Sequence, residues 1–392
     1  MPRLTRRSTV LGLAASGGSS LAMPAIAQDH PFRIGLLLPF SGASAAIGEA
    51  ISSGFDLYTR EIGGKMGGRA VELTRLDDAS DPARASSNIN RILGREKAQA
   101  LIGSVHDGVV TALARAAKDQ QLPLIIPHAG NLAATRDLCG ATVFRSAFTH
   151  WQLAYAIGKA VAETGVKTAG WATWDTAGGK ESTEGFREGL KTRGVELTKV
   201  LTLMFPELNL QRLLPRLSGI GADAIGAFFS GETAMQFVKG YAAAGLRGKI
   251  PLYGHGFLTE GLLSALGPDA EGVRTALPYG DGIDNPRNIA FRAAYKAFTN
   301  RNANAFAVHG YDAAQILAVG LDAVKGDITE MKAFAEAVRG AKIDSPRGAF
   351  TMSPTHAPIQ TIWLREAKAG ENQVISPIAE TLADPGTGCA VS

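Results

Sequence analysis

The 392-residue sequence lacks the features that mark several classes of protein. Beyond the N-terminus, no uncharged run approaches the ~18 to 20 residues that span a bilayer. No G-x-G-x-x-G follows the first strand-like segment, and neither G-x-x-x-x-G-K-[ST] nor G-x-S-x-G occurs anywhere. No H-x₃-H or C-x₂-C spacing supports a metal site. These absences argue against a membrane-spanning protein, a phosphate-cradling loop, a serine hydrolase and a metalloprotein, and we expect no cofactor.

The charge balance is also nearly neutral once the N-terminus is set aside. The segment "MPRLTRRSTVLGLAASGGSSLAMPAIAQ" has a basic start, an apolar middle and an A-x-A ending, which predicts a signal peptide over residues 1–27. Its Arg6-Arg7 pair suits twin-arginine export, and ordinary secretion is the alternative. Cleavage after Ala27 removes three of 40 basic residues and none of 36 acidic ones. The remaining charge near +1 gives no electrostatic case for nucleic acid or an anionic membrane.

Only two cysteines are present, Cys139 and Cys389. Because the signal directs the chain to an oxidising compartment, the periplasm, the two thiols are free to pair there. A disulfide requires their Cα atoms to come within about 7 Å. The sequence leaves a disulfide and two unpaired thiols as alternatives.

What the sequence does have is a regular alternation of short apolar runs and amphipathic helices, which predicts an α/β fold with parallel, doubly wound sheets. The pattern breaks at 141–152 and then restarts, which indicates two lobes of similar size. The expected strands lie at 32–39, 71–78, 99–103, 122–127, 167–173, 196–203, 223–229, 249–254 and 357–366, and the expected helices at 47–62, from 82, 109–120, 152–164, 182–193, 209–218, 232–244, 286–300 and 310–324.

In open α/β sheets, ligands bind beyond the carboxyl ends of the strands, so the loops after the strands hold the candidate ligand-binding residues. These loops are rich in Gly, Ser, Thr, His and aromatic residues. The candidates are Ser41, Ala46, Ile47, His106, Asp107, Gly108, His128, Ala129, Gly130, Phe148, His150, Trp151, Trp174, Thr176, Gly178, Ser230, Gly231 and His255.

Several of these residues have more than one interpretation. The neighbours His106 and Asp107 resemble a general-base pair, but catalytic partners are typically distant in sequence, so we expect no enzyme activity. Histidines that converge suit zinc or nickel, and they equally suit hydrogen bonding to a carboxylate. The tryptophans either belong to the core of a lobe or stack on a flat apolar ligand.

The ordered motifs resemble the periplasmic branched-chain amino acid or amide binding proteins of ABC transporters. They are "PFSGASAAIGEAISSGFDLYTREIGGKMGGRAVELTRLDDASDPARA", "ALIGSVHDG", "LPLIIPHAG", "FRSAFTHWQ", "YAAAGLRGKIPLYG" and "AVHGYDAAQIL", and the similarity covers about 32–365. The resemblance implies two Rossmann-like lobes joined by three crossovers and closing on a small molecule like a hinged trap. It places lobe 1 at 31–147 and 278–354 and lobe 2 at 148–277 and 355–392, with the ligand cleft between them.

The resemblance also implies where this chain departs from amino-acid binders. In those proteins a Ser binds the ligand carboxylate, a Thr binds both the carboxylate and the ammonium, and a Glu binds the ammonium. Asp107 stands here in place of the Ser, Gly130 in place of the Thr and His255 in place of the Glu. A buried ammonium without a carboxylate partner costs on the order of several kcal/mol, which disfavours an amino acid unless Asp107 takes that role. At the positions of the family's first-lobe cysteine pair stand Ser80 and His106.

Two further segments, "FRSAFTHWQ" and "TWDTAGGKES", look like those of a subgroup linked with aromatic acids. The resemblance therefore predicts a monomeric solute-binding protein that captures a small organic acid, with an aromatic carboxylate favoured, and passes it to ABC permease subunits. His128 and His255, one from each lobe, would donate to the carboxylate. The alternatives are an amino acid or amide binder for the same transporter class and a ligand-sensing receptor domain.

Overall fold

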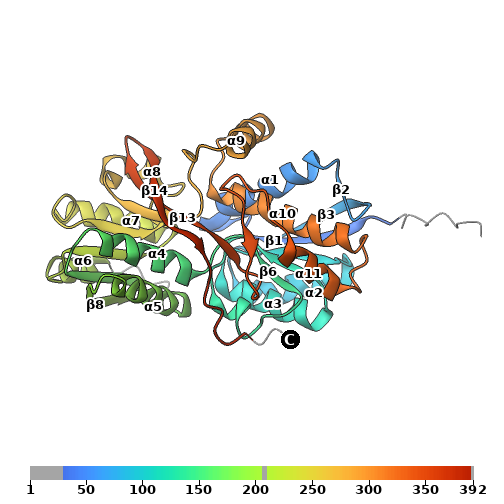
Figure 1. Ribbon diagram of the computed structural model, residues 1–392, viewed down its shortest axis with the longest axis horizontal. Coiled ribbons are helices and arrows are strands. Elements are labelled where there is room, and N and C mark those ends of the chain that lie inside the picture. Colours follow the sequence, from blue (N-terminus) through green and yellow to red (C-terminus); the bar gives the residue numbers. More distant parts are fainter. Residues whose placement is uncertain (1–29, 205–209, 390–392) are drawn as a thin grey trace, which may run out of the picture.

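The computed structural model describes residues 30–204 and 210–389, and the predicted signal peptide lies outside them. Two sheets stand side by side along the long axis, each covered by helices (Figure 1). No helix within the described ranges is long and apolar enough to cross a membrane.

The first lobe is built on a six-stranded sheet in the order β2-β3-β1-β4-β5-β6. All neighbouring strands are parallel except β2, which pairs antiparallel with β3. Its central strands are buried on both faces, which explains their continuous apolar sequence. The elements are β1 (Phe32–Leu38), α1 (Ala45–Glu61), β2 (Lys65–Met66), β3 (Arg69–Asp77), α2 (Pro82–Asn90), β4 (Ala100–Gly103), α3 (Asp107–Gln120), β5 (Leu124–Ile126) and β6 (Val143–Arg145).

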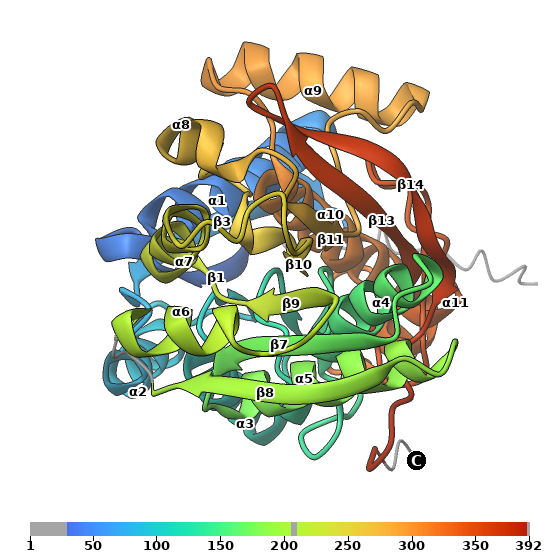
Figure 2. The ribbon, with the colours of Figure 1, turned by 90° about the vertical axis from the view of Figure 1, so that its left-hand side faces the viewer.

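The second lobe repeats this construction, with five parallel strands in the order β11-β10-β9-β7-β8 (Figure 2). Its buried strands alternate with helices that cover both faces. The elements are α4 (His150–Glu163), β7 (Thr168–Trp174), α5 (Ala177–Lys191), β8 (Glu196–Leu203), α6 (Leu210–Ser218), β9 (Ala224–Phe228), α7 (Gly231–Ala243), β10 (Leu252–His255), α8 (Leu263–Leu266) and β11 (Arg274–Leu277).

The chain then returns to the first lobe before it crosses again. The long helix α10 packs on α1, and two glycines allow the close approach, because a Cβ on Gly54 or Gly310 would lie 1.9 Å from a carbonyl oxygen of the other helix. Strand β13 joins the second sheet antiparallel to β11, and β14 pairs with β13. The returning elements are α9 (Pro286–Thr299), α10 (Ala305–Ala323), α11 (Met331–Gly340), β12 (Thr351–Met352), β13 (Pro358–Lys368) and β14 (Glu371–Leu382).

The predicted fold class and the order of its main elements are confirmed, and the differences have local causes. Helix α5 begins at Ala177, whereas the prediction began it at 182. The prediction started too late because Gly178 and Gly179, which lie in the first turn, have a low helix propensity. Helix α10 begins at Ala305 rather than 310. The break at 141–152 contains the short strand β6. The strands β2, β11, β12 and β14 and the helix α11 were not predicted.

The C-terminal tail beyond β14 leaves the second lobe and runs down to the first (Figure 1). Asp384 accepts a hydrogen bond from Thr149 and forms an ion pair with Arg136. Cys139 and Cys389 form a disulfide with a Cα–Cα distance of 5.9 Å. The two cysteines are therefore paired in a disulfide, one of the two alternatives that the sequence left open. The tail from Asp384 to Cys389 thus contacts the first lobe rather than only the second.

We expect the double variant Cys139→Ser/Cys389→Ser to lower the free energy of unfolding by about 2–4 kcal/mol, because the bridge closes a loop of 250 residues in the unfolded chain. Denaturant titration of both proteins measures the difference. Wild-type protein under reducing conditions is the matched comparison and should lose the same stability. Equal midpoints for oxidised wild type and variant would contradict the prediction.

Candidate functional site

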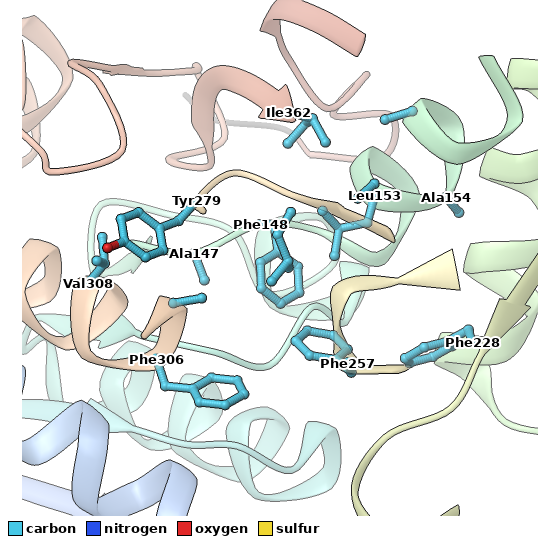
Figure 3. Packing of buried hydrophobic residues seen from close by; sticks show 14 of the residues in the cluster. Ala147, Phe148, Leu153, Ala154, Phe228, Phe257, Tyr279, Phe306, Val308 and Ile362 are labelled. Atoms are coloured by element: carbon cyan, nitrogen blue, oxygen red, sulfur yellow. The ribbon is translucent and has the colours of Figure 1, made fainter. Parts of the chain in front are cut away.

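The carboxyl ends of the parallel strands in both sheets bring the predicted loops to a common interior, where aromatic rings from both lobes meet. Phe148 follows β6, Phe228 ends β9, and Phe257 lies in the short helix η4 (Gly256–Leu258) after β10. In Figure 3, Phe257 lies between Phe306 of α10 and Phe228. The ring centroids of Phe257 and Phe148 are 5.4 Å apart. The centre of the interior is therefore an apolar, aromatic surface.

Four histidines are set among these rings. His128, after β5, lies 5.0 Å from Phe257 and 6.3 Å from His309 of α10, measured between ring centroids. His255, at the end of β10, stacks on Phe228 at 4.3 Å and lies 6.1 Å from His150. The imidazoles thus form two pairs, with Phe257 in contact with one member of each.

Six of the eight ring nitrogens of these imidazoles lack, within the described part of the chain, the hydrogen bonds that buried polar groups usually make. His255 and His309 are each 0% exposed, and neither ring nitrogen of either residue has a partner within the described part of the chain. The Nδ1 atoms of His128 and His150 are likewise unpartnered there. Unmet polar atoms that converge on one interior are what a polar ligand group requires.

Burial keeps three of the rings neutral. It lowers the pKa of His128 to about 3, with a smaller electrostatic contribution from His150 in the same direction and an opposing one from Asp107. The pKa values of His255 and His309 are also held well below the usual range by burial, and His309 also faces Arg347. Each neutral imidazole carries one N–H donor and one acceptor nitrogen.

A carboxylate–histidine contact lies at one side of the cluster. The Nε2 atom of His150, the first residue of α4, is 3.1 Å from Oδ2 and 3.4 Å from Oδ1 of Asp107, the first residue of α3. Burial raises the pKa of Asp107, but the charge and hydrogen bond of His150 outweigh it, so the net pKa lies below the usual range. His106 instead caps α3, since its Nδ1 accepts from the Gly108 backbone N–H. The adjacent His106 and Asp107 therefore do not form a dyad.

The loop that carries His128 is fixed by a buried arginine at the end of β6. Arg145 is fully buried and donates to the backbone oxygens of Ala129 and Asn131. Burial lowers its pKa to about 10, with Asp107 the largest opposing charge, so the guanidinium stays protonated at neutral pH. Gly130 leaves room for His150, because a Cβ there would lie 2.7 Å from its Nδ1.

The two lobes touch each other across the cleft through polar as well as aromatic contacts. Glu181 of α5 accepts from the backbone N–H of Leu132 in the first lobe at 3.0 Å. On the far side, Glu260 of the second lobe accepts from the Ala305 N–H that begins α10, also at 3.0 Å, and pairs with Arg365 at 2.6 Å. A carboxylate at a helix N-terminus is electrostatically favourable. The two lobes are therefore in direct contact in this structure, and the second supplies carboxylates to backbone N–H groups of the first.

The structure divides the predicted site residues into two groups. Asp107, Gly130, Phe148, His150 and Gly178 meet around the histidine cluster together with His128, Trp174 and His255. The other predicted residues have contacts of their own. Ser41 donates to Asp77, Ala46 and Ile47 lie in α1, His106 accepts from the Gly108 N–H and caps α3, the Ala129 oxygen accepts from Arg145, Trp151 Nε1 donates to Glu188, Thr176 caps α5, and Ser230 and Gly231 stand at the start of α7.

Sequence reasoning missed Phe228, Phe257, His309 and Phe306. The first two adjoin predicted candidates in the loops after β9 and β10, so the same rule would have found them. Phe306 and His309 lie on α10, whose return to the cleft is a tertiary fact with no local signal. Among the described residues, no group of three His, Cys, Asp or Glu side chains is arranged to hold a metal ion.

Comparisons with known proteins agree with this architecture. The sequence pattern of the periplasmic binding protein family matches residues 31–372. Leu/Ile/Val-binding protein homolog 6 of Brucella melitensis is 30% identical over 389 residues, covering 96% of this chain and 98% of the relative. A crystal structure of an R. palustris ABC transporter solute-binding protein in complex with benzoate is 39% identical, with a TM-score of 0.87, covering 92% of this chain and 100% of that one.

Two further structures extend the comparison. A solute-binding protein of Rhodopseudomonas palustris BisB5 in complex with 3,4-dihydroxybenzoic acid is 27% identical, with a TM-score of 0.82, covering 91% and 99% of the two chains. The leucine-binding protein LivK of Thermotoga maritima, 21% identical with a TM-score of 0.75 and coverage of 88% and 98%, shares the fold.

Two α/β lobes with parallel sheets, matched by the family pattern over residues 31–372, define a periplasmic binding protein of the type I fold, and this chain belongs to that family. It is a solute-binding protein of an ABC transporter, and its family works in the periplasm with membrane permeases. Its relatives are transport proteins rather than enzymes.

The contact between Glu260 and α10 predicts the effect of Ala305→Pro. Proline is well tolerated at the first helical position, and Asn304 before it is extended at φ −144° and ψ 176°, as proline requires. The change removes the N–H group that donates a hydrogen bond to Glu260. We therefore expect the free energy that holds the two lobes together to fall by about 1.5–3 kcal/mol. Small-angle X-ray scattering of the ligand-free protein should show a larger radius of gyration. An unchanged radius would mean that this bond does not hold the lobes together.

The neutral histidines predict loss of stability in acid. Between the ordinary pKa of about 6.5 and the lowered folded values, the unfolded chain binds protons that the folded chain does not, so acid favours unfolding. Each such histidine contributes about 1.4 kcal/mol per pH unit in this window. Urea titrations from pH 7.5 to 5 test this, and His309→Leu should show a shallower pH dependence than wild type. Parallel slopes for the two proteins would refute the assignment.

Proposed function

We propose that this protein captures an aromatic carboxylate in the cleft between its lobes and delivers it to the permease of an ABC importer. The observation that supports this most directly is the set of imidazoles, buried without partners, among the phenyl rings of Phe148, Phe228 and Phe257. A flat apolar ring with one anionic group matches both features. Two relatives above 25% identity are solved in complex with benzoate and 3,4-dihydroxybenzoic acid.

The chemistry of binding follows from the two kinds of side chain. Phenyl faces remove the ligand ring from water, and aromatic pairs prefer edge-to-face or offset contacts, which rings from several directions provide. The neutral histidines donate hydrogen bonds to the carboxylate, and the ring nitrogens that lacked partners thereby gain them. Because His128 and His309 come from the first lobe and His255 from the second, a ligand that contacts both stabilises the closed form.

An amino acid is the alternative, and its ammonium group is the obstacle. A buried ammonium needs a carboxylate partner. Among the described carboxylates here, Asp107 already interacts electrostatically with His150, so its charge is less available to a cationic ammonium, although it can still accept a hydrogen bond from a neutral donor. Glu181 accepts from the backbone of Leu132. Burial also raises the pKa of Glu181, so its charged form is disfavoured. These arrangements favour a ligand without an ammonium group.

Isothermal titration calorimetry of the mature chain against benzoate, cinnamate and leucine decides between the two. We expect heat and one-to-one binding for an aromatic acid and none for leucine. The chain is first unfolded, washed and refolded, so that any ligand carried through purification is removed. Tight leucine binding with no aromatic acid bound would overturn the proposal.

The variant His309→Leu separates ligand binding from folding. Removing a buried imidazole with no partner relieves an unmet polar cost of about 1–3 kcal/mol, so the ligand-free protein should be as stable as wild type or more so. Losing a donor to a carboxylate costs about 1.5–3 kcal/mol, so the affinity for benzoate should fall roughly 10- to 150-fold. Thermal unfolding and calorimetry measure the two effects.

The matched control is His356→Leu. His356 is also buried and packs against the first lobe, but its Nδ1 lies 3.1 Å from the backbone oxygen of Val143, and its ring stacks on Phe144. We expect this variant to be less stable than wild type and to bind benzoate normally. If His309→Leu were destabilised while keeping full affinity, His309 would be a structural residue and not part of the site.

A further inference from the structure

The carboxylate of Asp107 occupies the point in the cleft where three helices begin. Asp107 is the first residue of α3, and His150, which bonds to it, is the first residue of α4. The first turn of α5, from the other lobe, presses on the same pair: a Cβ on Gly178 would lie 2.9 Å from Asp107 Oδ2 and 3.0 Å from His150 Nε2. A side chain at this position would therefore displace Asp107 or His150.

Helix N-termini carry partial positive charge and are the usual places where proteins hold anions. Here the protein supplies the anion itself, because Asp107 stays ionised beside His150. A ligand carboxylate placed at the same point would meet a like charge and would find the helix N-termini already occupied. The anionic end of the ligand must therefore lie elsewhere in the cluster.

The Asp107 carboxylate nevertheless keeps the capacity to accept further hydrogen bonds. An ionised carboxylate has about four acceptor positions, and His150 is its one side-chain donor among residues 30–204 and 210–389. The Asp107 side chain retains 37% exposure, whereas the side chain of His150 retains 6%. Part of the Asp107 carboxylate beside His150 is therefore exposed.

The opposite end of the cluster has donors and a basic neighbour. His128 and His309 lie 6.3 Å apart between ring centroids, and three of their four ring nitrogens have no partner in the described part of the chain. The cation Arg347 acts on His309, and Asp312, 3.2 Å from Arg347, balances it. Phe257 contacts His128 on this side and His255 on the Asp107 side, so a phenyl surface separates the two ends.

We propose that Asp107 is a specificity-determining residue that accepts a hydrogen bond from a hydroxyl or amino group on the ligand ring. The ligand carboxylate lies at the other end, beside His128 and His309. The ligand class is then an aromatic acid that carries a hydrogen-bond donor on the ring, not an unsubstituted one. This inference rests on the proposed function and narrows it.

Calorimetry with benzoate, 4-methylbenzoate, 3-hydroxybenzoate, 4-hydroxybenzoate and 4-aminobenzoate tests the inference on the wild-type protein. At least one ring-donor acid should bind ten times more tightly than benzoate. The methyl compound matches the size of the added group without its donor, so it should bind no better than benzoate. Equal or tighter binding of the methyl compound or of benzoate overturns the role of Asp107 and leaves the proposed function standing. If no aromatic acid binds at all, the proposed function fails with it.

The variant Asp107→Ala removes the acceptor and the charge together. We expect the affinity ratio between the best ring-donor acid and benzoate to fall from at least tenfold to about one. A ratio that stays at the wild-type value overturns the inference. Thermal unfolding shows whether the variant is folded, and should it not fold, the wild-type panel alone decides.

Discussion

Everything about this site depends on one constraint: parallel strands place all their carboxyl ends at the same edge of a sheet. With two such sheets facing each other, the loops after β5, β6, β7, β9 and β10 converge on one interior. The side chains in those loops then meet although they are far apart in sequence. His150 contacts Asp107, 43 residues away, and Phe257 contacts His128, more than a hundred residues away.

The second determining feature is that the interior is closed by contacts of the protein with itself, while its imidazoles stay unmatched. Glu260 and Glu181 each find a backbone N–H in the first lobe. His255 and His309, by contrast, are enclosed by aromatic rings, and no group in the described segments meets their ring nitrogens. The contact between the lobes is thus stabilised by the hydrogen bonds of Glu181 and Glu260 and opposed by the burial of His255 and His309 without partners. A ligand group that hydrogen-bonds to these ring nitrogens would stabilise the arrangement in which the two lobes contact each other.

The sequence predicted the strands and the loops that follow them, because apolar runs bounded by Gly and Pro are local signals. Asp107, His128, His150 and His255 were found in this way. His309 could not be found, because nothing within α10 shows that the helix returns to the cleft from beyond β11. Trp151 was chosen for its residue type, but helical geometry turns it toward α5, where it bonds to Glu188. Local patterns thus locate a residue on the edge of a sheet but not the direction of its side chain.

Asp107 shows most clearly how the structure changes the meaning of a sequence feature. Next to His106 it looks like part of a catalytic pair, and at the start of a helix it looks like a misplaced charge in an anion site. In the fold, His106 turns back to cap α3, and Asp107 reaches His150 and the start of α5 instead. The positive ends of three helices stabilise this one carboxylate, so its charge is a fixed part of the cleft. A binding site that contains its own anion selects against a second anion nearby and in favour of a donor, and that selection requires no flexible or reactive group.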